Sequence, residues 1–204
     1  MANLLHINSS VRHQGSLSRQ LSAEFVAQWH VTHPNDRIIE RDLAAQPVPH
    51  LNEEILGAFF TPVEARSAAQ NQTAQLSEQL VAELFAADVI VIGAPMYNFS
   101  ISSGLKAWID HVARAGMTFK YTETGPVGLV TGKKVYVFTS RGGVYSSGPG
   151  KVMDFHETYL RAVLGFIGLT DITFVHTEGV AMGEGAVNTA VTQTRSAITD
   201  LIAA

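Results

Sequence analysis

The 204-residue chain contains no cysteine. The protein therefore has no disulfide, no thiolate nucleophile and no cysteine-ligated iron–sulfur cluster. Charged residues are also scarce, at 16% of the chain, and the net charge is −4 at pH 7. The excess of positive charge that favours binding to nucleic acid or anionic lipid is missing. We therefore expect neither a nucleic-acid partner nor a membrane partner.

Long apolar runs are also lacking. No stretch reaches the length of a transmembrane helix, and the start Met-Ala-Asn-Leu-Leu-His has no positively charged signal-peptide region. We expect a cytoplasmic location. The eight histidines show no metal-ligand spacing with acidic residues, so no metal site is expected. The length and the absence of repeats or linkers predict a single domain over residues 1–204.

Apolar strand-like runs alternate with helical periodicities along the chain. This alternation predicts an α/β fold with a doubly wound, five-stranded parallel sheet, in the strand order 2-1-3-4-5. Residues 44–60, with Pro47, Pro49 and Gly57, are expected to form a long loop with one helical turn. Residues 117–130 are expected to form a hairpin-like insertion with its turn at 123–126. The expected strands are 4–7, 37–42, 89–92, 134–139 and 172–176, and the expected helices are 17–30, 61–86, 102–112, 152–165 and 184–202.

Three loops follow strands whose carboxyl ends would lie side by side in this order. Residues 9–18 contain four serines and a glycine before a helix, and hydroxyls beside a helix N-terminus suit a phosphate. Residues 95–100 contain two aromatic rings, which suit a flat aromatic ligand. At Gly142 and Gly143 the backbone can approach a ring edge closely. Taken alone, the serine loop is better explained as a helix cap and the glycine pair as a tight turn, and the aromatic rings fit the core equally well, so the ligand hypothesis rests on their coincidence.

Other nucleotide sites and signalling folds do not match the residues. The first loop has no G-x-G-x-x-G pattern, and Gly132-Lys133-Lys134 precedes a strand instead of a helix. The strand ends at Asn8 and Gly93 lack the acidic cluster of a receiver domain. His6 and His176 lie in expected strands and are interpreted as structural residues.

Four segments identify a family resemblance: Ala94–Ser102, Ala113–Glu123, Gly128–Lys134 and Thr139–Gly143. They closely resemble the bacterial FMN-dependent NADH-azoreductases, which are flavodoxin-like quinone reductases and homodimers. The resemblance implies an FMN phosphate site at Ser10, Ser16, Leu17 and Ser18, and ring contacts at Pro95, Met96, Tyr97, Asn98, Phe99, Ser140, Arg141, Gly142 and Gly143. A substrate pocket is expected at Phe60, Phe119, Tyr121 and Tyr145, and the insertion is expected over the flavin or at the dimer contact.

The activity that the resemblance implies is ping-pong, two-electron transfer of a hydride from NADH via FMN to quinones and azo compounds. No catalytic side chain is required, because the flavin carries the chemistry. Arg141 either places positive charge near the reduced flavin or pairs with a surface carboxylate, and we favour the pairing. Two alternatives stay open: a flavodoxin-type single-electron carrier, and a flavin-binding interaction protein without enzymatic activity. The modest net charge of −4 and the aromatic insertion speak against the carrier.

Overall fold

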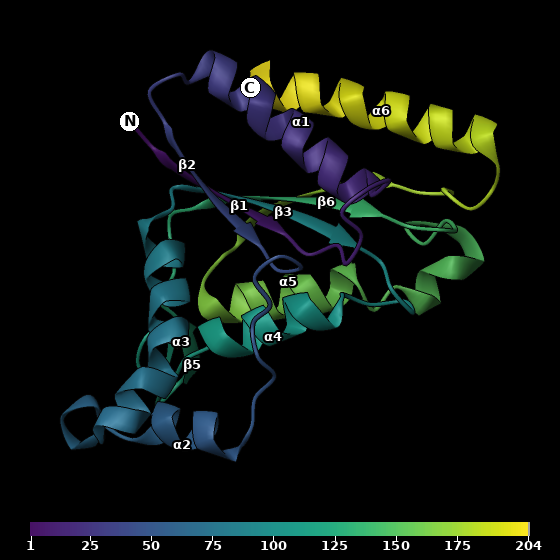
Figure 1. The fold of residues 1–204 in the computed structure, drawn as a ribbon. Coiled ribbons are helices and arrows are strands. Elements are labelled where there is room, and N and C mark those ends of the chain that lie inside the picture. The colour runs from purple at the N-terminus through teal and green to yellow at the C-terminus, as the bar shows by residue number, and fades with distance from the viewer. Residues whose placement is uncertain (204) are drawn as a thin grey trace.

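The computed structural model describes residues 1–203 and is built on a central parallel sheet. The sheet has five strands in the order β2-β1-β3-β6-β7, which confirms the predicted doubly wound arrangement (Figure 1). The strands are β1 (Asn3–Asn8), β2 (Arg37–Asp42), β3 (Val89–Pro95), β6 (Lys134–Ser140) and β7 (Asp171–Thr177).

β3 lies at the centre of the sheet, and each of its residues is buried. Its run of β-branched residues fits a strand that is covered on both faces. β2 lies at the edge, and most of its residues are partly or fully exposed, as its polar sequence predicts.

Helices cover both faces of the sheet (Figure 1). On one face, the ring of Phe25 packs 4.8 Å from that of Tyr136 and 5.3 Å from that of Phe138. On the other face, Trp108 and the leucines at 80 and 84 join one apolar core. The first layer contains α1 (Leu17–Thr32) and α6 (Glu184–Ala203), and the second contains α3 (Ala68–Ala86), α4 (Ser103–Val112) and α5 (Glu157–Ile167).

The segment between β2 and α3 differs from the prediction. Residues 53–60 form the helix α2 (Glu53–Phe60), where we expected a loop, and the side chain of Asn52 accepts a hydrogen bond from Ile55 N at its start. Thr61 ends this helix, so the predicted helix start there is wrong. A short 3₁₀ turn, η1 (Val63–Ala65), follows. α3 begins later, because Ser67 and Gln70 form a capping box.

The insertion is an antiparallel hairpin, β4 (Phe119–Thr122) and β5 (Gly125–Gly128), separate from the main sheet. The predicted turn was too long, because Gly125 and Pro126 already belong to β5. α4 carries the chain back to the amino ends of the strands before the hairpin begins. Gly128 packs against the backbone of Gly168, just before β7. The hairpin therefore lies at the end of the sheet opposite to the carboxyl ends of the strands.

The fourth predicted helix also begins later than expected. Residues 148–153 form the 3₁₀ helix η2 (Gly148–Met153), and α5 starts at Glu157. The carboxylate of Asp154 accepts hydrogen bonds from His156 N and Glu157 N, at 3.1 and 3.0 Å. In residues 1–203, no helix is both long enough and apolar enough to cross a membrane.

Candidate functional site

The carboxyl ends of β1, β3 and β6 bring the three predicted loops together. Ser9 N donates to Gly93 O at 3.0 Å, and Met96 N donates to Ser140 O at 2.9 Å. A cavity of about 150 Å³ lies among the loops and is lined by Ser10, Arg12, Gly15, Ser16, Leu17, Pro95, Met96, Tyr97, Ser140, Gly142 and Val180. The sequence analysis missed Arg12, Gly15 and Val180.

The first loop presents neutral hydrogen-bond donors. Ser16 caps α1 by accepting a hydrogen bond from Arg19 N at 3.5 Å. The N–H groups of Leu17 and Ser18 begin the helix and have no intrahelical acceptor. The hydroxyls of Ser16 and Ser18 lie 3.3 Å apart, and that of Ser10 lies 3.3 Å from the Tyr97 hydroxyl. This donor set, at the positive end of a helix dipole, fits a phosphate.

The middle loop has a strained backbone. Asn98 and Phe99 have φ angles of 49° and 68°, in the left-handed region. Tyr97 N donates to Ser100 O at 2.9 Å, and Ser100 N donates to Tyr97 O at 3.0 Å. Two consecutive left-handed residues inside such a pair of bonds are typical of a type I′ turn. A left-handed Phe costs about 1–2 kcal/mol, and strain of this kind gathers at ligand sites.

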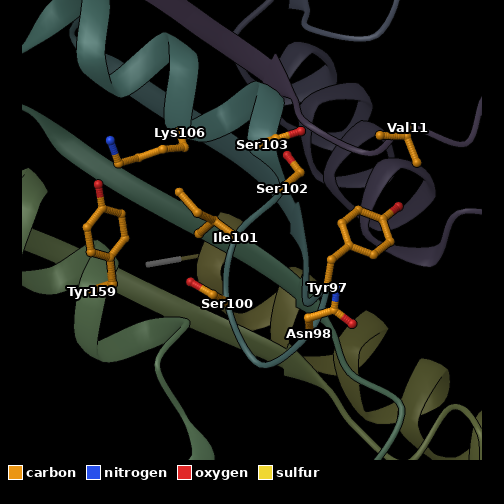
Figure 2. A pocket seen from close by; sticks show the side chains of 9 residues that line it. All are labelled: Val11, Tyr97, Asn98, Ser100, Ile101, Ser102, Ser103, Lys106 and Tyr159. Atoms are coloured by element: carbon orange, nitrogen blue, oxygen red, sulfur yellow. The ribbon is translucent and has the colours of Figure 1, made fainter. Parts of the chain in front are cut away.

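A larger cavity, of about 690 Å³, opens beside this turn (Figure 2). Figure 2 shows Lys106 and Tyr159 next to each other, across the cavity from Tyr97. Helices α4 and α5 provide these two residues, so no strand-end pattern in the sequence could identify them. The lining consists of Val11, Tyr97, Asn98, Ser100, Ile101, Ser102, Ser103, Lys106 and Tyr159.

The third loop contains two glycines that the turn itself does not need. Neither Gly142 nor Gly143 has a positive φ angle. A Cβ atom at Gly142 would lie 3.6 Å from the Cβ of Ala181, an ordinary contact. At Gly143 the nearest atoms belong to the Tyr145 ring, at 3.4 Å. Close approach of a ligand therefore explains Gly142 better than backbone conformation does.

The side chain of Arg141 is fully buried and lines neither cavity. Its Nη1 lies 3.0 Å from Asp154 Oδ2 and 3.1 Å from Glu178 Oε1, and its Nη2 lies 3.8 Å from Glu157 Oε2. The favoured pairing of Arg141 is confirmed, although the carboxylates are largely buried instead of lying on the surface. Only the backbone of Arg141 is left to contact a ligand in the crevice.

The carboxylate of Glu178 connects Arg141 to the loop that contains Tyr145. Burial raises the pKa of Glu178, but hydrogen bonds from Ser146, Tyr145 N and Arg141 outweigh burial and keep the pKa below its usual value. Burial, and next the charge of Arg141, lower the pKa of His156 to about 3. His156 is therefore neutral near pH 7, and the cluster contains more carboxylates than cations.

His176 is a second histidine at this cluster. Its Nε2 lies 2.9 Å from Glu157 Oε2, and its Nδ1 lies 2.9 Å from Thr139 Oγ1. Burial, and next the charge of Arg141, lower the pKa of His176. On the other side of the sheet, His6 contacts Glu40 and Ser22, so both strand histidines have structural hydrogen-bond partners.

The predicted substrate-pocket residues are not together within the described chain. The Tyr145 ring lies edge-on to that of Phe99, with 6.1 Å between centroids. Phe60, on α2, and Tyr121, on the hairpin, are 78% and 73% exposed and line neither cavity. Phe119 is buried, with its ring 4.4 Å from that of Phe166. Among residues 1–203, no group of three or more histidine or acidic side chains could hold a metal ion.

Comparisons with known proteins agree with this geometry. A family model described as "Flavodoxin-like fold" matches residues 2–202. The chain is 63% identical over 204 residues to an FMN-dependent NADH:quinone oxidoreductase of Herminiimonas arsenicoxydans, covering 100% of both chains. The crystal structure of an azoreductase from Bacillus anthracis str. Sterne covers 99% of both chains, with a TM-score of 0.91 and 28% identity.

A third comparison includes a bound cofactor. The crystal structure of an FMN-dependent NADH-azoreductase from Bacillus anthracis str. Ames Ancestor, in complex with FMN, has a TM-score of 0.86 and 25% identity. The match covers 98% of this chain and 99% of that one. The chain therefore belongs to the family of the flavodoxin-like fold, together with the FMN-dependent NADH:quinone oxidoreductases that it resembles.

Proposed function

We propose that the protein is an FMN-dependent NADH:quinone oxidoreductase that also reduces azo compounds. The convergence of the serine loop, the strained aromatic turn and Gly142 on one crevice supports this proposal most directly. The 63% identical relative has this activity in its name, and similar solved structures are named azoreductases.

The residues of the crevice fit FMN by their chemistry. The hydroxyls of Ser10, Ser16 and Ser18, with the Leu17 N–H, would hold the phosphate. Residues 95–99 and the backbone of 140–143 would contact the ring system. When bound, FMN supplies a carrier that accepts a hydride from NADH and passes two electrons to a quinone or azo compound. The protein then needs no acid–base pair of its own.

The chain's own residues orient and enclose the ring. The left-handed turn fixes the Asn98 and Phe99 backbone before any ligand arrives, so less conformational freedom is lost on binding. The Glu178 carboxylate accepts from Tyr145 N and Ser146 N at 2.8 and 3.0 Å, and thereby holds the loop beside Phe99. The Tyr145 ring packs edge-on against the Phe99 ring, and this apolar pair favours a flat apolar acceptor.

We also propose that the protein is a homodimer. Phe60 and Tyr121 are exposed and lie away from the crevice of their own chain. Aromatic side chains are enriched at the core of protein–protein interfaces. In a dimer, the exposed hairpin residue Tyr121 would lie at the subunit contact and reach the partner's site. The absence of nucleic-acid and membrane partners and a cytoplasmic location stay predictions from the sequence.

The test of the proposed function is optical. The purified protein, supplied with FMN, should be yellow, lose its colour with NADH in the absence of oxygen, and regain it with a quinone. A chain that gains no flavin absorbance from FMN contradicts the proposal. Flavin binding with accumulation of one-electron-reduced flavin and negligible NADH oxidation would favour the single-electron carrier instead.

A further inference from the structure

Arg19, in the first turn of α1, lies behind the serine loop and contacts its backbone. Its Nη2 donates to Ser10 O at 3.0 Å, and its Nε donates to Arg12 O at 3.3 Å. The same guanidinium pairs with the carboxylate of Asp42, at 2.6 Å from Nη1 and 3.1 Å from Nη2. One side chain therefore joins two carbonyls of the loop to the end of β2.

These two carbonyl contacts also orient the next two peptide N–H groups. In a trans peptide the C=O and the following N–H point in opposite directions, and the chain has no cis bond in its described residues. The N–H groups of Val11 and His13 therefore point away from Arg19. Within residues 1–203, neither of these N–H groups donates to another protein atom.

The guanidinium has little capacity left to bind the anion itself. An arginine has five N–H donors, and four hydrogen bonds to protein atoms engage those of Arg19. Its charge is matched by the carboxylate of Asp42. The hydrogen bond from Arg19, together with those from the N–H groups of Ala44 and Ala45, lowers the pKa of Asp42 to about 2. The contribution of Arg19 to anion binding is therefore the shape of the loop.

We infer that Arg19 is a positioning residue for phosphate recognition: with Asp42, it holds residues 10–15 in the conformation that admits the phosphate of FMN. This role rests on the proposed function, because the ligand is the flavin assigned there. It goes beyond the serine hydroxyls, because it assigns phosphate selectivity to an ion pair outside the cavity lining.

The test compares FMN with riboflavin, which has the same ring and ribityl chain but no phosphate. The full-length chain, stripped of flavin, is titrated with each ligand by fluorescence quenching. For Arg19→Gln we expect affinity for FMN to fall about tenfold, which corresponds to ~1.4 kcal/mol, while affinity for riboflavin changes by less than about twofold. Arg19→Lys should give an intermediate loss, because an ammonium has fewer, more flexible donors.

The matched control is Arg195→Gln. Arg195, on α6, also pairs with a carboxylate of α1, Glu24, through two bonds of 2.8 Å, but it donates no hydrogen bond to the loop. This control should keep the wild-type ratio of FMN to riboflavin affinity. The inference is overturned if Arg19→Gln and Arg19→Lys both keep the wild-type ratio of FMN to riboflavin affinity. It is also overturned if these variants lose affinity for both flavins equally.

A second measurement needs no flavin. Trypsin cleaves after Arg12, inside the loop, and loops that lose their contacts are cut faster. Release of the fragment 1–12 from the flavin-free chain should be faster for Arg19→Gln than for wild type or Arg195→Gln. Unchanged release overturns the inference. If neither flavin binds but Arg19→Gln still releases the fragment faster, the proposed function is refuted. The role of Arg19 in holding the loop conformation is then still supported.

Discussion

Replacement of Arg141 by methionine should destabilise the protein more than any surface ion-pair substitution. The variant Arg141→Met keeps an unbranched apolar stem but removes the guanidinium group and its charge. It leaves Asp154 and Glu178, whose side chains are 9% and 13% exposed, without their cation. Loss of one partner of a buried ion pair typically costs about 3–5 kcal/mol.

The structure points to the lower end of this range. Two nitrogens of the Arg141 guanidinium, Nε and Nη2, are buried without a hydrogen-bond partner. Removal of these unsatisfied donors offsets part of the loss, so we expect about 3 kcal/mol. At acidic pH, the difference in unfolding free energy between Arg141→Met and wild type should become smaller, because protonated carboxylates no longer need a counter-charge.

The assay is urea unfolding of the flavin-free proteins, followed by circular dichroism at one protein concentration. With a slope of about 2 kcal/mol per M of urea, the midpoint should fall by about 1.5 M. Lys106→Met is the control, because Lys106 is half exposed and pairs with Asp110 one turn along its helix. Lys106→Met should lower the free energy of unfolding by only about 0.3–0.5 kcal/mol.

A midpoint shift for Arg141→Met below about 0.5 M would refute the reasoning, since the carboxylates would then be accessible to water. The double variant Arg141→Met/Glu178→Gln gives a further check. It should recover part of the stability, because it removes one of the uncompensated charges.

Three further predictions concern pH, the cofactor and the substrate. Because the pKa of His156 is about 3 when folded and near 6.5 when unfolded, the unfolded chain alone takes up a proton between these values. The free energy of unfolding should fall by about 1.4 kcal/mol per pH unit below pH 6. In His156→Leu, urea unfolding at several pH values should lack this contribution to the pH dependence. An unchanged pH dependence would contradict the low pKa of His156. Gly142→Val should lower FMN affinity about tenfold by blocking close approach, with the urea midpoint close to that of Gly185→Ala; unchanged affinity would show that the ring lies elsewhere. Tyr121→Ala should raise the KM for quinones and leave FMN affinity unchanged, and a wild-type KM would remove Tyr121 from the pocket.

The sheet could be predicted from the sequence because its strands are short apolar runs between turn residues. Even the polar edge strand β2 has its predicted bounds, Arg37–Asp42. Segment 44–86 was harder to predict, because Thr61 and Ser67 both match helix-start patterns. Tertiary contacts decide between them: the Arg66 guanidinium, between the two, pairs with Glu78 on α3.

The site could be predicted only as far as it follows strand ends. Loops after β1, β3 and β6 must meet once the strand order is known. Val180 enters the crevice because Val180 N donates to Arg141 O at 3.1 Å, a contact with no local sequence signal. The carboxylates around Arg141 come from two segments, the start of α5 with Asp154 and Glu157, and Glu178 after β7, so no spacing rule could identify the whole set.

The left-handed turn at Asn98 and Phe99 also limits which mutations this part of the chain can accept over evolution. Glycine, asparagine and aspartate tolerate a positive φ, whereas β-branched residues do not. Changes of acceptor preference should therefore accumulate at cavity positions such as Ile101 and Tyr159, which have no positive φ angle and line the larger cavity. The φ angle of 68° at Phe99 has a free-energy cost that other contacts of the folded chain must offset.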